Sequence, residues 1–431
     1  MSVEPGQLAG GGVFSVCFCL PLVGGYVKVS DLFRCGLLCL SLTAQGVSAQ
    51  SPVGTNLAYS DGMFDRQNDV TNKIPLALRA RASGDLGTGR LYLGGRFVGT
   101  VIREDTNTAG KFPILSRFPA SHSTGTSDTY GVINEISLGA TLTLPMVTAY
   151  AQGEYSELIF PGQSDVQLRK YWLAVGDLGQ SPFYAAIGRK TVNFGDFSSY
   201  APFTHNHSAH YFWAQTRDPL LELGYVTDRT EIALSLIREH RGFRVLNSPD
   251  NDGGYENFAV NFRHRLDLSG GLALRLGAGF LRGTIYDSTI AHHPPNSGVN
   301  RIWNGAWDVN ATLSAARFDV MGEFTRTEHA WPATGHKVSA LTVQGRYRTE
   351  LFSRPALWSL AASRGVQGAS GTEWEKMDQV VLGLQVQAAP NVSLGAEYVF
   401  NEGFVPLIMP TVVADSGVRS HTFIVGARLT F

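Results

Sequence analysis

The chain has 431 residues, of which 16% are charged and 44% hydrophobic, and its formal net charge at pH 7 is −1. Soluble globular proteins carry roughly 25% charged residues, so this chain is poor in charge, and its balanced charge gives no reason to expect nucleic acid as a partner. No apolar run of about 20 residues follows residue 50, which excludes a bundle of membrane-spanning helices. The aromatic content of 11% excludes a disordered chain.

Residues 27–49 are predicted to form a secretory signal peptide. Lys28 and Arg34 give it a basic start, and CGLLCLSL forms its apolar centre. The small residues at 47–49 provide a cleavage site, so the mature chain is expected to begin at Gln50.

Residues 1–26 contain no Lys or Arg, which is wrong for the start of a signal peptide, so we interpret them as a spurious extension from a start codon placed too far upstream. All four cysteines of the chain precede residue 50. The body of the protein can therefore form neither a disulfide framework nor a cysteine metal site. The four are Cys17, Cys19, Cys35 and Cys39.

From residue 89 to the end, apolar residues alternate with small, polar or charged ones. The stretches 132–144, 272–280 and 392–400 each have one apolar and one polar face, which is strand periodicity. A soluble sandwich would bury the apolar faces, but lipid contact explains equally well why so many strands share this pattern with so little charge. The sixteen candidate strands are 89–103, 131–144, 147–157, 166–177, 182–192, 219–226, 230–240, 255–266, 271–284, 305–316, 317–329, 336–349, 356–365, 376–389, 391–401 and 418–431.

The connections between these strands alternate between short and long. The short ones include 145–146, 178–181, 227–229 and 267–270, and the long ones include 104–130, 193–218, 241–254, 285–304 and 402–417. Outer-membrane barrels have short periplasmic turns and long outer loops. The chain is therefore predicted to be all-β, with residues 89–431 forming a transmembrane antiparallel up-and-down barrel of about 16 strands in a Gram-negative outer membrane.

The last strand resembles the recognition signal of outer-membrane barrels. Apolar residues occupy alternate positions up to a carboxy-terminal aromatic residue, at Phe423, Val425, Ala427, Leu429 and Phe431. Barrel-assembly machinery, membrane lipid and lipopolysaccharide are therefore expected partners. Aromatic girdles at the membrane interfaces are predicted at Tyr150, Tyr155, Tyr171, Tyr184, Tyr225, Tyr347 and Trp358.

A barrel of this size is too wide for strand side chains to fill, so an aqueous channel is the default expectation. Charges of both signs are predicted to face the interior in near balance, with a slight lean toward anions from two local arginine pairs. The predicted pore-lining residues are Lys170, Arg263, Arg265, Arg275, Arg346, Arg348, Arg428, Glu135, Glu154, Glu222, Asp319, Glu323 and Glu397.

The long connection at 193–218 occupies the position of the third outer loop, which in sixteen-stranded porins commonly folds into the barrel. Its predicted constriction residues are Asp196, His205, His207, His210, Arg217 and Asp218. Its aromatic residues could form a track, at Phe197, Tyr200, Phe203, Tyr211, Phe212 and Trp213. The histidines could ligate a metal, but their spacing matches no specific metal motif, so neither a metal nor another cofactor is predicted.

Residues 50–88 are polar and lack strand alternation until ALRARA near residue 77. This segment is expected to be a periplasmic extension or a short plug. It is much too short for the folded plug of a TonB-dependent receptor.

The stretch YWLAVGDLGQSPFYAAIGRKTVNFGDF at 171–197, followed by DPLLELGYVTDRTEIALSL at 218–236, resembles the LbtU-type siderophore porins. The resemblance covers roughly residues 132–237. It implies an outer-membrane channel, with iron-loaded siderophores as candidate solutes. Analogy with other sixteen-stranded porins would make it a homotrimer.

Three functions stay open on the sequence alone. The preferred one is a non-enzymatic porin that forms an aqueous channel for small hydrophilic solutes. An adhesin or structural barrel without transport is the first alternative. A barrel hydrolase is the second, and Ser208 between His207 and His210 is its only suggestive grouping, because no GxSxG elbow occurs.

Overall fold

The computed structural model describes residues 52–68, 70–110, 125–157, 165–216, 218–238, 255–287, 303–404 and 416–431. The predicted extension at 1–26, the predicted signal at 27–49 and Arg217 lie outside these residues. By its contacts the chain divides into Met1–Ser51 and Pro52–Phe431, and everything below concerns the second unit. Among its described residues, no helix is long and apolar enough to cross a membrane.

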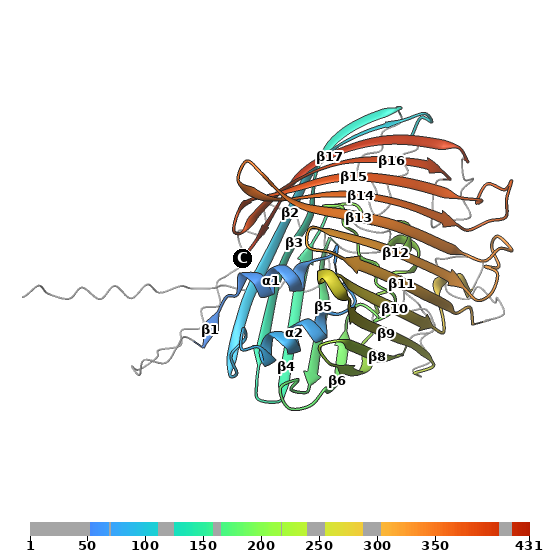
Figure 1. Cartoon of the computed structure of the whole chain (residues 1–431). Helices are drawn as coiled ribbons and strands as arrows, with labels where there is room; N and C mark the ends of the chain where they lie inside the picture. The colour runs from blue at the N-terminus through green and yellow to red at the C-terminus, as the bar shows by residue number, and fades with distance from the viewer. Residues whose placement is uncertain are drawn as a thin grey trace, which may run out of the picture. The chain divides into compact units, whose positions relative to one another are not determined.

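Strands β2 to β17 form a closed antiparallel barrel (Figure 1). Each strand pairs with its neighbours in sequence, and β17 pairs back with β2, so every backbone edge is satisfied within the ring. The sixteen strands are β2 (Arg90–Thr106), β3 (Ser127–Thr143), β4 (Val147–Tyr155), β5 (Val166–Val175), β6 (Phe183–Arg189), β7 (Leu220–Val226), β8 (Thr230–Ile237), β9 (Asn257–Asp267), β10 (Ala273–Leu281), β11 (Ala306–Ser314), β12 (Phe318–Thr327), β13 (Ser339–Leu351), β14 (Arg354–Val366), β15 (Met377–Ala389), β16 (Val392–Gly403) and β17 (Val418–Thr430). All sixteen predicted strands are confirmed, with ends that move by a few residues.

The segment before the barrel contains short elements that alternation did not reveal. Strand β1 (Val53–Gly54) lies parallel to β2 and is followed by helices α1 (Leu57–Phe64) and α2 (Lys73–Ala82). The side chain of Asn56 caps α1 by accepting a hydrogen bond from the Tyr59 amide at 3.0 Å. A third helix, α3 (His207–Phe212), lies in the loop between β6 and β7.

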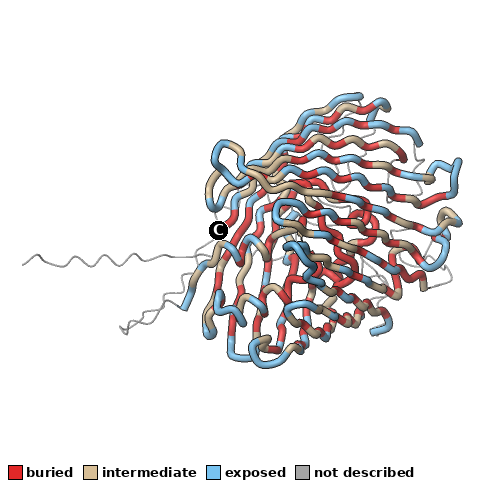
Figure 2. Tube along the Cα trace, in the orientation of Figure 1, coloured by how far each residue is buried: buried red, intermediate tan, exposed pale blue. Residues whose placement is uncertain are grey.

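Burial alternates along the strands, as the banding of the trace shows (Figure 2). On β7 the inward Glu222 is 1% exposed, whereas the adjacent outward Leu223 is 56% exposed. The outward side chains of β17 behave in the same way, since Phe423 and Val425 are about half exposed. An apolar outer wall around a polar interior is typical of a lipid-facing barrel.

Two of the predicted girdle residues are misplaced. Tyr150 and Tyr184 face the interior and are buried, because they share strand parity with inward polar residues such as Gln152. Alternation along β4 and β6 already directs these two side chains into the barrel, so they could not lie at a membrane interface. The other five predicted girdle aromatics lie on the outward parity of their strands.

A β-bulge on β5 places two consecutive basic residues inside the barrel. Pairing with β4 passes from Gln152 opposite Lys170 to Gly153 opposite Leu168, which leaves Arg169 as the extra residue. Both Arg169 and Lys170 are buried. Strict alternation would have directed Arg169 to the lipid face, so the bulge adds an interior charge that a period of two does not predict.

Gly188 on β6 has no room for a side chain. Its φ is +152°, and an added Cβ would lie 2.2 Å from the carbonyl oxygen of Tyr171 on β5. Gly153 on β4, by contrast, has open space around its Cβ position. We expect Gly188→Ala to destabilise the barrel by about 3 kcal/mol. The temperature at which the folded band is lost in heat-modifiability gels should fall for Gly188→Ala and stay near wild type for Gly153→Ala.

Candidate functional site

Two segments occupy the barrel interior. The first, residues 52–88, lies at the end of the barrel where the turns are short. There Arg81 donates to the carbonyls of Leu144 and Pro145 at 2.8 and 2.7 Å, and Arg79 donates to the carbonyl of Thr227 at 3.1 Å. Because all three carbonyls belong to short turns, α2 is fastened to the rim at that end.

Helix α1 is held by inward side chains of β2 and β3. The Tyr59 hydroxyl lies 2.9 Å from that of Thr141. Arg96, which is 2% exposed, pairs with Asp61 at 2.7 Å and donates to the Phe64 carbonyl. A buried arginine needs such partners, since an unpaired charge would be strongly destabilising.

The linker between α1 and α2 is described at residues 65–68 and 70–72, and it crosses from the strand wall to the loop after β6. Arg66 pairs with Glu154 at 3.2 Å and with Glu135 at 3.6 Å. On the other side, the Gln67 carbonyl accepts from the Ser199 amide at 2.6 Å, and the Gln67 side chain donates to the Ala201 carbonyl at 2.8 Å. The linker is therefore bonded to both the wall and the loop.

The second segment, the loop after β6, extends across the interior to the opposite strands. Glu323 on β12 accepts the amides of Asp196 and Phe197, each at 2.9 Å. Gln344 on β13 accepts the Tyr200 amide at 2.9 Å.

The same loop reaches the last two strands. Glu397 on β16 accepts from the amides of Phe203 and Thr204 and from the Thr204 hydroxyl, the last at 2.6 Å. Arg428 on β17 donates to the Pro202 carbonyl at 2.8 Å. Side chains of β12, β13, β16 and β17 thus provide the hydrogen bonds that the crossing backbone needs away from water.

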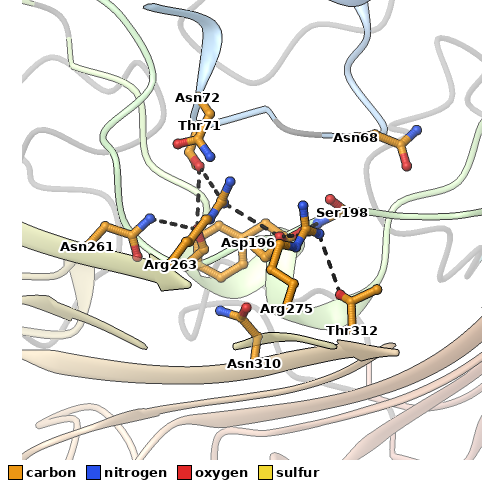
Figure 3. A network of polar contacts seen from close by, with 12 residues as sticks. Asn68, Thr71, Asn72, Asp196, Ser198, Asn261, Arg263, Arg275, Asn310 and Thr312 are labelled. Atoms are coloured by element: carbon orange, nitrogen blue, oxygen red, sulfur yellow. Dashed lines mark hydrogen bonds and ion pairs between the residues drawn. The ribbon is translucent and has the colours of Figure 1, made fainter. Parts of the chain in front are cut away.

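Asp196 is the central charge of this loop (Figure 3). Its carboxylate is fully buried and lies 2.9 Å from Arg275 and 3.6 Å from Arg263. Burial alone would raise its pKa, but these two guanidinium groups lower the pKa of Asp196 to about 2. Arg263 also donates to the Thr71 hydroxyl at 3.0 Å, so the network joins barrel, loop and linker.

The predicted histidine cluster does not form a metal site. His207 in α3 approaches Ser363 at 2.6 Å, whereas His205 and His210 line a separate cavity. The described part of the chain contains no group of three or more His, Cys, Asp or Glu side chains placed to hold a metal ion. Ser208 contacts the Thr342 hydroxyl at 3.0 Å and is completely buried, so the hydrolase grouping has no substrate access.

The predicted aromatic track is not continuous. Phe197, Tyr211 and Phe212 pack in a hydrophobic cluster toward the long-loop end, and Phe203 belongs to a different cluster. Tyr200 stacks instead beneath Arg346, with 4.3 Å from the guanidinium carbon to the ring centre. The aromatics of the loop fix it to several walls rather than lining one path. Asp218 lies half-buried just before β7.

The charged residues predicted to line the pore all lie on the inward parity of their strands, but the two inner segments cover most of them. Glu222 and Glu323 are 2% exposed or less. The exceptions are arginines near the short-turn end, where the side chains of Arg265 and Arg348 are 59% and 42% exposed. Arg265 also lines two of the cavities that lie beside the linker.

In the part of the chain that the structure describes, three cavities lie beside the linker. The smallest, about 140 Å³, lies beside β2 to β5 and includes Arg66, Gln67 and Val70 in its lining. The other two, of about 680 and 400 Å³, share Arg265 and Arg275. The linker contributes Asn72 to the 680 Å³ cavity and Asp65 and Asn68 to the 400 Å³ cavity. No residue that lines the smallest cavity lines either of the others, so the linker separates it from them.

The sequence analysis missed several charges of this interior, among them Arg66, Arg96 and Arg169. Arg66 and Arg96 hold the linker and α1, and Arg169 pairs with Glu154 at 3.8 Å. The inward parity of Arg96 on β2 could have identified it. Nothing local marks Arg66, and the bulge conceals Arg169.

The docking of α3 should depend on pH through His207. Burial lowers the pKa of His207 from 6.5 to about 3, so the docked loop holds the neutral ring. The docking energy is therefore complete above pH 6.5 and falls by about 1.4 kcal/mol for each pH unit below it. Hydrogen exchange of residues 206–212, corrected for the intrinsic rate, should accelerate between pH 6 and 4 in wild type. His207→Gln should abolish this pH dependence, and an equal acceleration in that variant would contradict the assignment.

No protein-family model matches the chain, and no curated protein matches its sequence. Its fold is similar to solved outer-membrane proteins. OprB of Pseudomonas putida gives a TM-score of 0.53 at 10% identity, over 85% of this chain and 100% of that one. OmpF of Salmonella typhi, solved in complex with daunomycin, gives a TM-score of 0.52 at 13% identity, over 79% of this chain and 97% of that one. These similarities show a porin-type barrel fold, and the more specific resemblance to the LbtU-type porins stays a prediction.

Proposed function

We propose that this chain is an outer-membrane porin for small hydrophilic solutes, with its short turns toward the periplasm. The observation that supports this most directly is a closed barrel with an apolar outer wall and, inside, cavities of about 680 and 400 Å³ lined by charged side chains. Sixteen strands enclose more space than the inward side chains of the strands can fill. The chain fills part of that space with two docked segments.

Residues 52–88 act as an internal plug in this proposal. The 65–72 linker lies between the smallest cavity and the two larger ones, and ion pairs and hydrogen bonds hold it. Conduction then requires the linker to move away from the loop. Polar contacts hold the linker, whereas α1 and α2 also pack through apolar side chains such as Met63, Ile74 and Leu78 against the wall.

The exposed apolar side chains at the end of the chain support two further parts of the proposal. Phe423, Val425, Leu429 and Phe431 are all between 38% and 55% exposed, as a lipid-facing strand and an assembly signal both require. We assign the outward wall to lipid and lipopolysaccharide, and a homotrimer by analogy of fold.

Iron-loaded siderophores are the solute class that the LbtU-type resemblance implies. They would have to pass the loop after β6, so deleting 196–217 should change iron-siderophore accumulation in cells that lack other uptake routes. Unchanged accumulation would rule out siderophores as the solute but would not contradict the proposal that the barrel is a channel.

The closely filled interior favours one competing function, a structural or adhesive barrel that never conducts. A reversible disulfide between the linker and the loop distinguishes the porin from the structural barrel. The predicted mature chain has no cysteine of its own, so an engineered pair of cysteines would have no competing thiol. Gln67 and Ser199 are joined by a backbone hydrogen bond of 2.6 Å, so the double variant Gln67→Cys with Ser199→Cys should form a disulfide. In planar bilayers the oxidised variant should be silent and should conduct after reduction, while single cysteine variants respond to neither treatment. Silence of the wild type and of the reduced double variant would favour the structural barrel.

A further inference from the structure

We propose that arginines at the short-turn ends of β9, β10 and β13 form a binding site for small solutes that carry two or more carboxylate or phosphate groups. This inference rests on the proposed channel and names the class of solute that its periplasmic half would hold.

Two ion-pair groups in this region share one pattern, in which a single carboxylate lies between two guanidinium groups. They are Asp319 with Arg346 at 2.5 Å and with Arg348, and Asp267 with Arg265 at 2.9 Å and with Arg229 at 3.4 Å. Each group therefore has one more positive than negative charge. Such an excess attracts anions, most strongly at low ionic strength.

The cavity of about 400 Å³ brings these groups together. Arg265, Arg275 and Arg346 line it from three different strands. Its other lining residues include neutral side chains that can donate hydrogen bonds, namely Asn68, Ser198, Tyr200, Thr312 and Ser314. Asp65 is the one carboxylate among the described lining residues, and it already accepts from the Gln67 amide at 2.8 Å. The balance of charge and donors favours an anionic solute over a neutral sugar.

The guanidinium groups are held in place before any solute arrives. Arg346 stacks on Tyr200 and donates to the Asn68 side chain at 3.2 Å, while its base is fixed in β13. Its side chain is still 25% exposed, and that of Arg265 is 59% exposed, so both can be reached through water. Planar guanidinium forks match carboxylate and phosphate oxygens in pairs. Three forks around one cavity therefore suit a solute with several such groups.

The 680 Å³ cavity shares Arg265 and Arg275, so the site lies where the two larger cavities meet. The linker borders it through Asn68, which also contacts Arg346. An anion bound at Arg346 would compete with that Asn68 contact.

The test is calorimetric titration of the detergent-solubilised full chain with citrate and, separately, with inorganic phosphate, at low salt. Citrate should bind saturably, and Arg265→Gln and Arg346→Gln should each weaken it by roughly tenfold. Arg364→Gln is the matched control, because Arg364 lies on the outward face and pairs with Asp378 at 2.5 Å. Its citrate affinity should equal that of wild type, and glucose should not bind. If phosphate also binds saturably, and Arg265→Gln and Arg346→Gln weaken its affinity as they weaken that of citrate, the site accepts phosphorylated solutes as well as carboxylates.

Absence of saturable citrate binding, or an equal loss in Arg364→Gln, would overturn the anion site. These outcomes are distinct from failure of the channel, which conductance measures. A barrel that conducts without binding citrate rejects only the site, and one that binds citrate but never conducts rejects only the channel.

Discussion

Deleting residues 52–88 while keeping residues 1–51 should raise single-channel conductance in planar bilayers by roughly tenfold, to the range of an open sixteen-stranded lumen. The deletion removes the linker that separates the cavities and both helices that fill the short-turn end. Nothing in the sixteen-strand ring is removed, since β17 pairs directly with β2. The barrel should therefore still fold, which heat-modifiability gels can verify before conductance is measured.

A shorter deletion provides the matched control. Removing residues 52–55 takes away β1 and leaves Asn56, which caps α1, together with both helices and the linker. Its conductance should stay at the wild-type level. If the 52–88 deletion also conducts no better than wild type, the loop after β6 closes the barrel by itself and the plug assignment is wrong.

The strands of this protein are predictable because each one alternates between lipid and interior. The large outward side chains of β7 and β17 recur at spacing two, and no tertiary information is needed to see them. The same rule fails wherever a strand departs from that period, as at Arg169. It was also overlooked at Tyr150, where an aromatic residue type was given more weight than strand parity.

The contents of the barrel are harder to predict from the sequence. Helix α2 buries Ile74, Ala77 and Leu78 at helical spacing, but this apolar stripe is only about one turn long. Helix α1 is equally short and packs partly against polar strand side chains such as Arg96 and Thr141. The position of the loop after β6 was expected from its order in the chain, and Asp196 was named within it. The strand residues that bind this loop, Glu323 and Glu397, were predicted only to face the interior. Their contacts with the loop were not predicted, because the path of a crossing loop is not encoded in local periodicity.

Replacing Asp196 by Asn should have the largest effect of any single substitution in the loop. Two arginines, Arg263 and Arg275, face this one carboxylate, and Arg263 is only 4% exposed. Without the carboxylate the two positive charges repel each other in a poorly solvated place, which should cost about 3–5 kcal/mol of stability. Because the pKa of Asp196 is about 2, mild acid should not reproduce the effect, and wild type should keep this ion pair at pH 4.

Hydrogen exchange of residues 193–204 and the heat-modifiability temperature together measure this loss. Asp378→Asn is the matched control, because Asp378 pairs with Arg364 on the outward face and keeps 27% of its side chain exposed. Exposed ion pairs contribute about 1 kcal/mol or less, so the control should differ little from wild type. Equal effects of the two substitutions would mean that Asp196 does not hold the loop. Faster exchange in the loop of Asp196→Asn alone, with the barrel still folded, would show that its buried carboxylate fixes the loop across the lumen.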